Sequence, residues 1–285
     1  MNLVCILLWL VAGGGQARVS PSPTAINRAF NRLYNCDFAG AHSILDDQLR
    51  SHADDPLLYS VHAAAYLYSE FHRLRILETD FFEDNDKVTD RKKLKPDPSV
   101  RAQLFAMTGE ARKRAAARLA VDPKDRNAMF ALCMASGVET DYYSLVEKRY
   151  IRSYSLSKES QQYARKLLAL NPPFYDAYLT LGSVEYVVGN LNFFFRLFIR
   201  FDQIDGNKQK AIEELKKVVE GGRYYPPFAK ILLSVIYLRE KQPQQALALL
   251  REMARDFPEN PLIKTEVDRL SGGVSIMPPA NGSAK

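Results

Sequence analysis

The side chains that most often bind metal ions or move protons are few in this chain and unevenly placed. Its four histidines, His42, His52, His62 and His72, all lie in the first quarter of the sequence. None belongs to an H-E-x-x-H pair, in which two imidazoles bind zinc from one helix face. His62 and His72 are ten residues apart, which is not the i, i+4 spacing of a same-face pair. We expect surface or interhelical histidines and no metal site.

Other patterns that would indicate catalysis are missing from the sequence. It has no G-x-S-x-G motif and no phosphate-binding glycine loop, and no cysteine stands in a signature. Asp84-Asn85-Asp86 resembles the start of a calcium loop but lacks the required glycine and glutamate. We expect no catalytic residue and no cofactor. An enzyme stays an alternative, which a pocket joining His62, His72 and carboxylates would support.

Composition indicates a folded chain with a mixed surface. Hydrophobic residues make up 47% and charged residues 25%, with 15 Tyr and 15 Phe, so the chain has enough apolar surface to form a core. The net charge is +6, but basic and acidic residues are interspersed, and no nucleic-acid motif is present. We expect no nucleic-acid partner.

Residues 1–17 contain no charged side chain, and residues 3–12 form an apolar run typical of a signal-peptide core. Gly15 and Ala17 place small residues before a cleavage point, and residues 18–23 then form a Ser/Pro-rich mature N-terminus. We expect export to the periplasm or another extracytoplasmic compartment. Because no Lys or Arg precedes the run, a retained membrane anchor is the alternative. Cys5 lies in this segment, which leaves Cys36 and Cys133, too few for a disulfide framework.

The periodicity of the chain carries most of its structural information. In residues 230–258, Leu233, Ser234 and Tyr237 fit one helix, and Ala246, Leu250, Met253 and Pro258 fit a second. Small residues mark where two helices approach closely, and large ones fill the space around that contact. This spacing resembles the tetratricopeptide repeat, with Ser in place of the usual Gly and Lys230 in place of the usual aromatic residue.

Earlier segments repeat the pattern, because small residues recur at matching places: Ala41, Ala111, Ala164 and Ala211 in second helices, and Cys133 and Gly182 in first helices. We predict five hairpins, near residues 24–53, 57–121, 125–170, 175–221 and 226–257, with a capping helix at 261–270. The expected fold is all-α, a right-handed superhelical solenoid over residues 24–270, followed by a disordered tail at 271–285.

The resemblance implies a concave groove, lined by first helices, in which a partner peptide or protein lies. Transferred to this sequence, the groove-facing positions are Tyr34, Tyr68, Asn127, Phe130, Asp176, Tyr186 and Arg239.

Three enlarged turns distinguish the chain from a plain repeat. Two of them begin with Glu-Thr-Asp and an aromatic pair, Phe81-Phe82 and Tyr142-Tyr143. The pairs either pack the end of a long helix or form a partner-facing surface on one side of the solenoid. The third turn contains an amphipathic segment, residues 193–204, with Phe194 and Phe198 in its apolar stripe. It either packs against the repeats, grips a partner helix or lies on a membrane.

These observations favour a non-enzymatic scaffold or adaptor that binds a protein or peptide outside the cytoplasm. The alternative is a peripheral membrane factor for envelope assembly or transport that uses residues 193–204.

Overall fold

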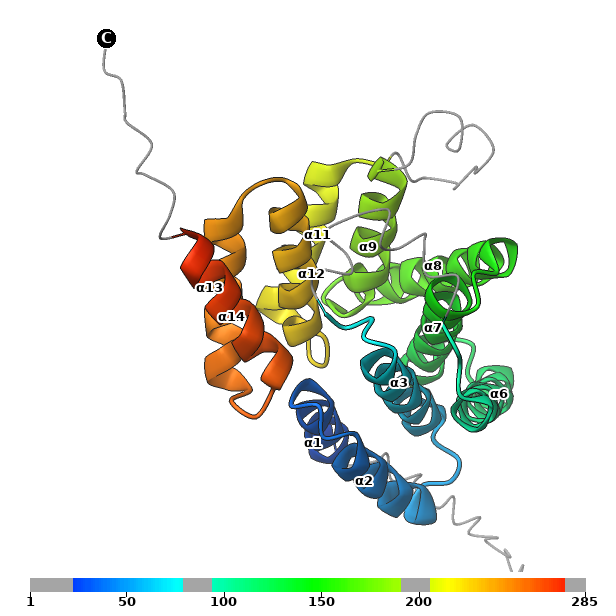
Figure 1. Ribbon diagram of the computed structural model, residues 1–285. Helices are drawn as coiled ribbons and strands as arrows, with labels where there is room; N and C mark the ends of the chain where they lie inside the picture. Colours follow the sequence, from blue (N-terminus) through cyan, green and yellow to red (C-terminus); the bar gives the residue numbers. More distant parts are fainter. Residues whose placement is uncertain (1–22, 79–93, 191–205, 275–285) are drawn as a thin grey trace, which may run out of the picture.

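The computed structural model describes residues 23–78, 94–190 and 206–274, and every regular element in these ranges is a helix (Figure 1). The expected all-α class is confirmed. The elements of the described ranges are α1 (Pro23–Tyr34), α2 (Phe38–Ser51), α3 (Pro56–Arg73), α6 (Pro98–Val121), α7 (Arg126–Asp141), the π-helical segment η1 (Tyr142–Val146), α8 (Tyr150–Leu170), α9 (Ala177–Asn190), α11 (Lys208–Gly221), α12 (Pro226–Arg239), α13 (Pro243–Asp256) and α14 (Pro261–Val274).

Consecutive helices pack against each other in pairs: α1 with α2, α3 with α6, α7 with α8, α9 with α11, and α12 with α13. Each pair also contacts the next, and α14 packs on α13. The helices begin and end close to the expected hairpin boundaries. One difference is that α14 continues to Val274, so residues 271–274, expected in the tail, are helical.

Alanines in the second helices lie where the helices of each pair meet. Ala41, Ala111, Ala164, Ala211 and Ala246 are all 0% exposed, although they come from five different pairs. A methyl side chain lets two helix backbones approach closely while larger neighbours fill the surrounding space. In the first helices, Cys133 and Ser234 are also buried. The register read from the sequence therefore places its small residues at helix contacts.

The first helix ends in the same way in the first two pairs and in the last pair. Cys36, Arg75 and Lys241 have φ angles of 61°, 60° and 60°. In each turn, the following residue donates its backbone N–H to the carbonyl five positions earlier, at 2.7–2.8 Å. This bond satisfies a carbonyl that the helix end leaves free. The turns thus repeat in backbone geometry without repeating in sequence.

Gly182 of α9 lies at a close approach to α11 in the fourth pair. A Cβ atom there would lie 3.1 Å from the carbonyl oxygen of Ala211 and 3.1 Å from Cγ of Leu215. We expect Gly182→Leu to overpack this crossing and lower the free energy of unfolding by about 1–3 kcal/mol. Chemical denaturation measures the change.

Gly109 of α6 offers a matched control, because a Cβ atom there meets nothing within 4 Å. Leu is a better helix former than Gly, so Gly109→Leu should leave stability unchanged or raise it by up to about 1 kcal/mol. Equal effects of the two substitutions would show that the α9–α11 crossing is not as close as described.

The two ends of the helical series meet. Tyr34, at the end of α1, donates its hydroxyl to the carbonyl of Tyr224 at 3.0 Å. Asn260, before α14, donates its side-chain amide to the carbonyl of Tyr34 at 2.6 Å. The Tyr34 ring also packs on Phe257, with centroids 5.3 Å apart. Figure 1 shows α1 beside the last helices, so the series closes on itself.

Candidate functional site

Aromatic side chains fill the centre around which the first helices of the pairs are arranged. Phe130 of α7 is 2% exposed, and its ring lies 5.0 Å from Phe174, 6.0 Å from Tyr224 and 5.9 Å from Tyr225. Phe30 of α1 contacts Tyr224 and Tyr225 from the other side, at 5.6 and 5.7 Å. These rings, which we call the aromatic centre, belong to the hydrophobic core, so a partner cannot lie between them while α1 packs against them.

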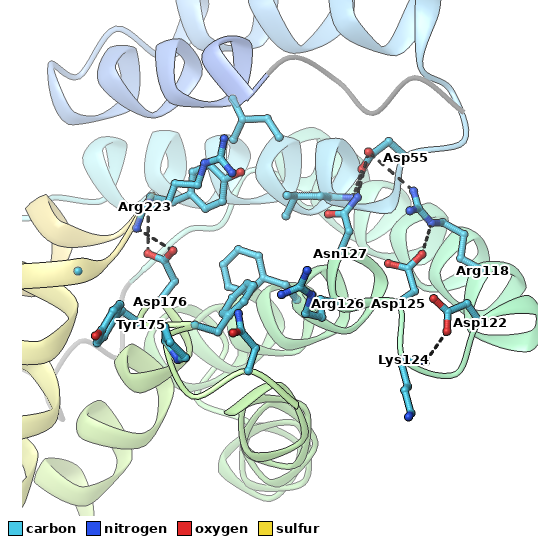
Figure 2. A pocket seen from close by; sticks show the side chains of 18 residues that line it. Asp55, Arg118, Asp122, Lys124, Asp125, Arg126, Asn127, Tyr175, Asp176 and Arg223 are labelled. Atoms are coloured by element: carbon cyan, nitrogen blue, oxygen red, sulfur yellow. Dashed lines mark hydrogen bonds and ion pairs between the residues drawn. The ribbon is translucent and has the colours of Figure 1, made fainter. Parts of the chain in front are cut away.

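A cavity of about 670 Å³ opens beside the aromatic centre, where the loops between successive pairs come together. Figure 2 shows its polar side chains in two groups, with Arg126 drawn between them. The lining residues are Ile26, Asp55, Leu57, Arg118, Asp122, Lys124, Asp125, Arg126, Asn127, Phe130, Asn171, Pro173, Phe174, Tyr175, Asp176, Gly221, Arg223 and Tyr224.

One group joins the second and third pairs. Asp55 caps α3 by accepting the backbone N–H of Leu57 at 2.8 Å, and it accepts both bonds from the side-chain amide of Asn127 at 3.0 and 3.2 Å. Arg118 lies 2.6 Å from Asp125, which caps α7, and 3.9 Å from Asp55. Burial raises the pKa of Asp55, against the opposing effect of these donors.

Asp176 forms the other group, at the start of α9. Its carboxylate accepts the backbone N–H groups of Arg223, Tyr224 and Tyr225 at 2.9–3.0 Å. These bonds hold the loop between α11 and α12, which supplies two rings of the aromatic centre. Burial raises the pKa of Asp176, although the three donors favour the ionised form. Asp176 is therefore a positioning residue whose oxygens are occupied.

The basic side chains at the mouth of the cavity are differently placed. Lys124, Arg126 and Arg223 are all exposed. Arg223 lies over the ring of Tyr224, 5.3 Å from its centroid. Within the described residues, no carboxylate lies within ion-pair distance of these three side chains. Asp55, Asp125 and Asp176 thus have internal donors and Asp122 is exposed, while Lys124 and Arg126 face solvent and Arg223 also acts electrostatically on Asp176.

The structure brings three of the seven expected groove residues, Asn127, Phe130 and Asp176, into this cavity. Tyr34 is 7% exposed and bonded across the closure. The other three lie elsewhere: Tyr68 packs near Phe228, with centroids 5.8 Å apart, while Tyr186 and Arg239 interact with each other between α9 and α12. The expected open groove is replaced by a filled centre and a cavity at its edge, because the first and last pairs meet.

The aromatic pair that follows α7 is buried. Tyr142 is 0% and Tyr143 9% exposed, and both pack on Phe105 of α6 with centroids 5.5 and 5.2 Å apart. The π-helical turn η1 directs both rings inward. This burial favours the packing alternative over a partner-facing surface. Phe81, Phe82, Phe194 and Phe198 lie outside the described residues, as do residues 1–17 and 193–204.

The histidines do not have the neighbours that the enzyme alternative would require. His62 meets His42 and Tyr66, with centroids 4.9 and 5.1 Å apart. His72 is exposed and packs beside Phe38. In the described ranges no group of three His, Cys, Asp or Glu side chains is arranged to hold a metal ion. In the described part of the chain, His62 and His72 thus have different neighbours and line neither of the two cavities found there.

Sequence reasoning missed Lys124, Arg126 and Arg223 because they lie in or beside loops between pairs, outside the repeat pattern. A signal was present, since the segments 122–126 and 171–176 occupy equivalent places between consecutive hairpins. No described helix is long and apolar enough to cross a membrane. Comparison with known proteins adds no assignment, because neither a family model nor a curated protein matches this chain.

Proposed function

We propose that this chain is a non-enzymatic scaffold that holds an acidic peptide segment of a partner protein in the cavity between its loops. The observation that carries the proposal is how the charged side chains of this cavity are bonded. Asp55, Asp125 and Asp176 accept bonds from protein donors and the exposed Asp122 accepts one from the backbone of Lys124, whereas the side chains of Lys124 and Arg126 extend into solvent with no carboxylate at ion-pair distance among the described residues. A ligand with carboxylates complements such a site.

Apolar surface at the same edge indicates a peptide in preference to a small anion. Tyr175 lines the cavity and is 36% exposed, and Leu170 and Val121, which immediately precede lining residues, are 41% and 81% exposed. Partner-binding surfaces combine exposed aromatic and apolar side chains with Arg. The segment that fits has acidic residues interspersed with apolar or aromatic ones.

The finer description of the fold belongs to this proposal. We propose that the five pairs of described helices are tetratricopeptide-like hairpins stacked as a right-handed superhelix, capped by α14. The buried alanines at equivalent places and the repeated turns with a positive φ angle support this arrangement. In this arrangement binding moves from the concave face to the loop edge, because aromatic side chains occupy the centre.

Selection from a random peptide display library tests the proposal. The full chain should enrich peptides in which Asp or Glu alternate with apolar residues, and Arg126→Glu should abolish that enrichment. Lys264→Glu, an exposed residue of α14 outside the cavity, changes the charge equally and serves as the control. Enrichment of peptides no more acidic than the starting library would refute the proposed ligand class.

We also propose that the scaffold acts outside the cytoplasm, on the strength of the uncharged apolar segment at residues 3–12. Mass spectrometry of native material should then show a chain that begins at Arg18, after cleavage behind Ala17. A cytoplasmic protein that retains Met1 would contradict this. The membrane alternative rests on residues 193–204, and no observation in the described residues favours it over the scaffold.

A further inference from the structure

Two imidazoles with buried ring nitrogens that make no hydrogen bond lie between α2 and α3. His62 is 3% exposed, and neither of its ring nitrogens has a hydrogen-bond partner. His42, facing it from α2, also has a buried Nδ1 without a partner. The two rings are 4.9 Å apart, and Tyr66 covers both, at 4.3 Å from His42 and 5.1 Å from His62. Buried polar groups are normally bonded, so this cluster is an exception that needs a reason.

The surroundings favour the neutral form of both rings. Burial, and to a smaller extent the neighbouring His42, lower the pKa of His62 to about 4; burial also lowers the pKa of His42. The opposing group is Asp46 of α2, whose Oδ1 is 3.9 Å from Nε2 of His62, but its side chain is 61% exposed and screened by water. Among the described residues, α1, α6 and α7, which also pack around this region, contribute no charged group to the pair.

The sign of the pH effect follows from these shifts. An unfolded or detached histidine titrates near pH 6.5, above the pKa of the packed ring, so the detached state binds more protons below that pH. Stability of the α2–α3 contact is therefore complete above about pH 6.5 and decreases as the pH falls toward 4. Acid weakens this interface in particular because it is where both rings are buried.

The pair α1–α2 lies at the chain end and has two attachments. On one side it packs on α3. On the other, α1 meets the last pairs through the bonds of Tyr34 with Tyr224 and Asn260 and through a bond from the backbone N–H of Glu259 to Oδ1 of Asn35 at 3.2 Å. Phe30 and Tyr34 cover Tyr224, Tyr225 and Phe257 from this position. Loss of the first attachment leaves only the second, which is a small contact.

We propose that the α1–α2 pair is an acid-released cover over the aromatic centre, with His42 and His62 as its sensor. In acid the cover leaves α3, the closure at Tyr224 opens, and the rings of Tyr224, Tyr225 and Phe130 become a concave apolar surface. At neutral pH that surface is closed and the cavity at the loop edge stays as described. The inference does not depend on the ligand of the cavity.

Melting of the whole chain is an unsuitable readout, because other groups respond with the opposite sign. Burial raises the pKa of Asp141, at the end of α7, to about 7, so acid relieves a cost at that site. Burial also raises the pKa of Glu214 on α11. A local measurement separates the cover from these groups.

Hydrogen exchange of the full chain, corrected for intrinsic rates, should be compared at pH 7 and pH 4.5. Peptides from α1 and α2 should lose more than about tenfold protection at pH 4.5, while peptides from α7 and α8 keep theirs. The variant His42→Leu with His62→Leu should retain protection of α1 and α2 at both pH values. His72→Gln, an exposed histidine of α3, should behave as the wild type.

Three results of this experiment would overturn the proposal. Full protection of α1 and α2 at pH 4.5 in the wild type, or equal loss across all helices, overturns the proposal. Loss that persists in the double Leu variant also overturns it. If that variant does not fold at pH 7, His62→Gln takes its place, since it is neutral and polar. If that fails too, the wild-type comparison of α1–α2 with α7–α8 decides.

Discussion

Tyr142→Ala should lower the free energy of unfolding by about 3–5 kcal/mol, among the largest effects expected from one substitution in this chain. Tyr142 is the largest fully buried side chain among the described residues and lies edge-on to Phe105. Truncation leaves a cavity between α6 and η1 that the π-helical turn cannot close without losing its own contacts. Chemical denaturation measures the loss directly.

The matched variant Tyr142→Phe separates packing from polarity. The hydroxyl of Tyr142 is buried without a hydrogen-bond partner, and burial raises its pKa to about 12. Removing an unpartnered buried hydroxyl costs little, so Tyr142→Phe should equal or slightly exceed the wild type in stability. A variant Tyr142→Ala that melts like the parent while losing partner capture would instead establish the partner-facing alternative for this pair.

Asp176→Ala is the second large effect, with an expected loss of about 3 kcal/mol. The substitution leaves the three backbone N–H groups of residues 223–225 without their acceptor, at about 1–3 kcal/mol each, and water from the cavity offsets part of that. Relief of the buried carboxylate, whose pKa is raised, offsets some more. Denaturation should show a smaller loss for Asp176→Asn, which keeps one acceptor oxygen.

Asp122 provides the comparison within the same cavity. Its carboxylate is exposed and accepts one bond, from the backbone N–H of Lys124 at 2.9 Å. Asp122→Ala should therefore change stability by less than about 0.5 kcal/mol. Equal losses for Asp122→Ala and Asp176→Ala would show that the loop before α12 is not held by the Asp176 carboxylate.

The helices and their contacts were predictable because packing imposes a spacing on the sequence. Ala111 and Ala246 stand four residues before the buried Ala115 and Leu250, and Ala164 stands four residues after the buried Ser160; all three alanines are fully buried. The sequence predicts an end at Leu270, four residues before that of α14, because Ser271 and the glycines after it are typical of a tail, whereas the helix continues through them. Local composition predicts the last residue of a helix poorly.

The closure of the series was not predictable, because it joins residues that no period relates. Tyr34 and Tyr224 are 190 positions apart, and nothing near either residue signals the other. The same limit applies to the cavity. Arg126 and Arg223 line one cavity from the start of α7 and from the loop before α12, two places that the repeat pattern does not relate. Likewise, the spacing of His42 and His62 within the sequence says nothing about their contact across two helices.

The burial of two expected groove residues, Phe130 and Tyr34, follows from the contact between the first and last helices. In an open solenoid, Phe130 and Tyr34 would face a groove wide enough for a peptide. Here the loop before α12, α1 and the end of α13 place four more aromatic rings there, those of Tyr224, Tyr225, Phe30 and Phe257. Apolar surface that a partner would cover is instead covered by the chain itself.

The central claim is that the cavity binds acidic peptides through its free cations. Its most direct test is the affinity of a labelled ten-residue peptide, eight glutamates and two phenylalanines, for the full chain at 50 and 300 mM salt. The wild type and Lys264→Glu should bind equally, Arg126→Glu should bind about tenfold or more weakly, and higher salt should weaken the wild type. Equal binding by Arg126→Glu and Lys264→Glu, with no dependence on salt, would contradict the account.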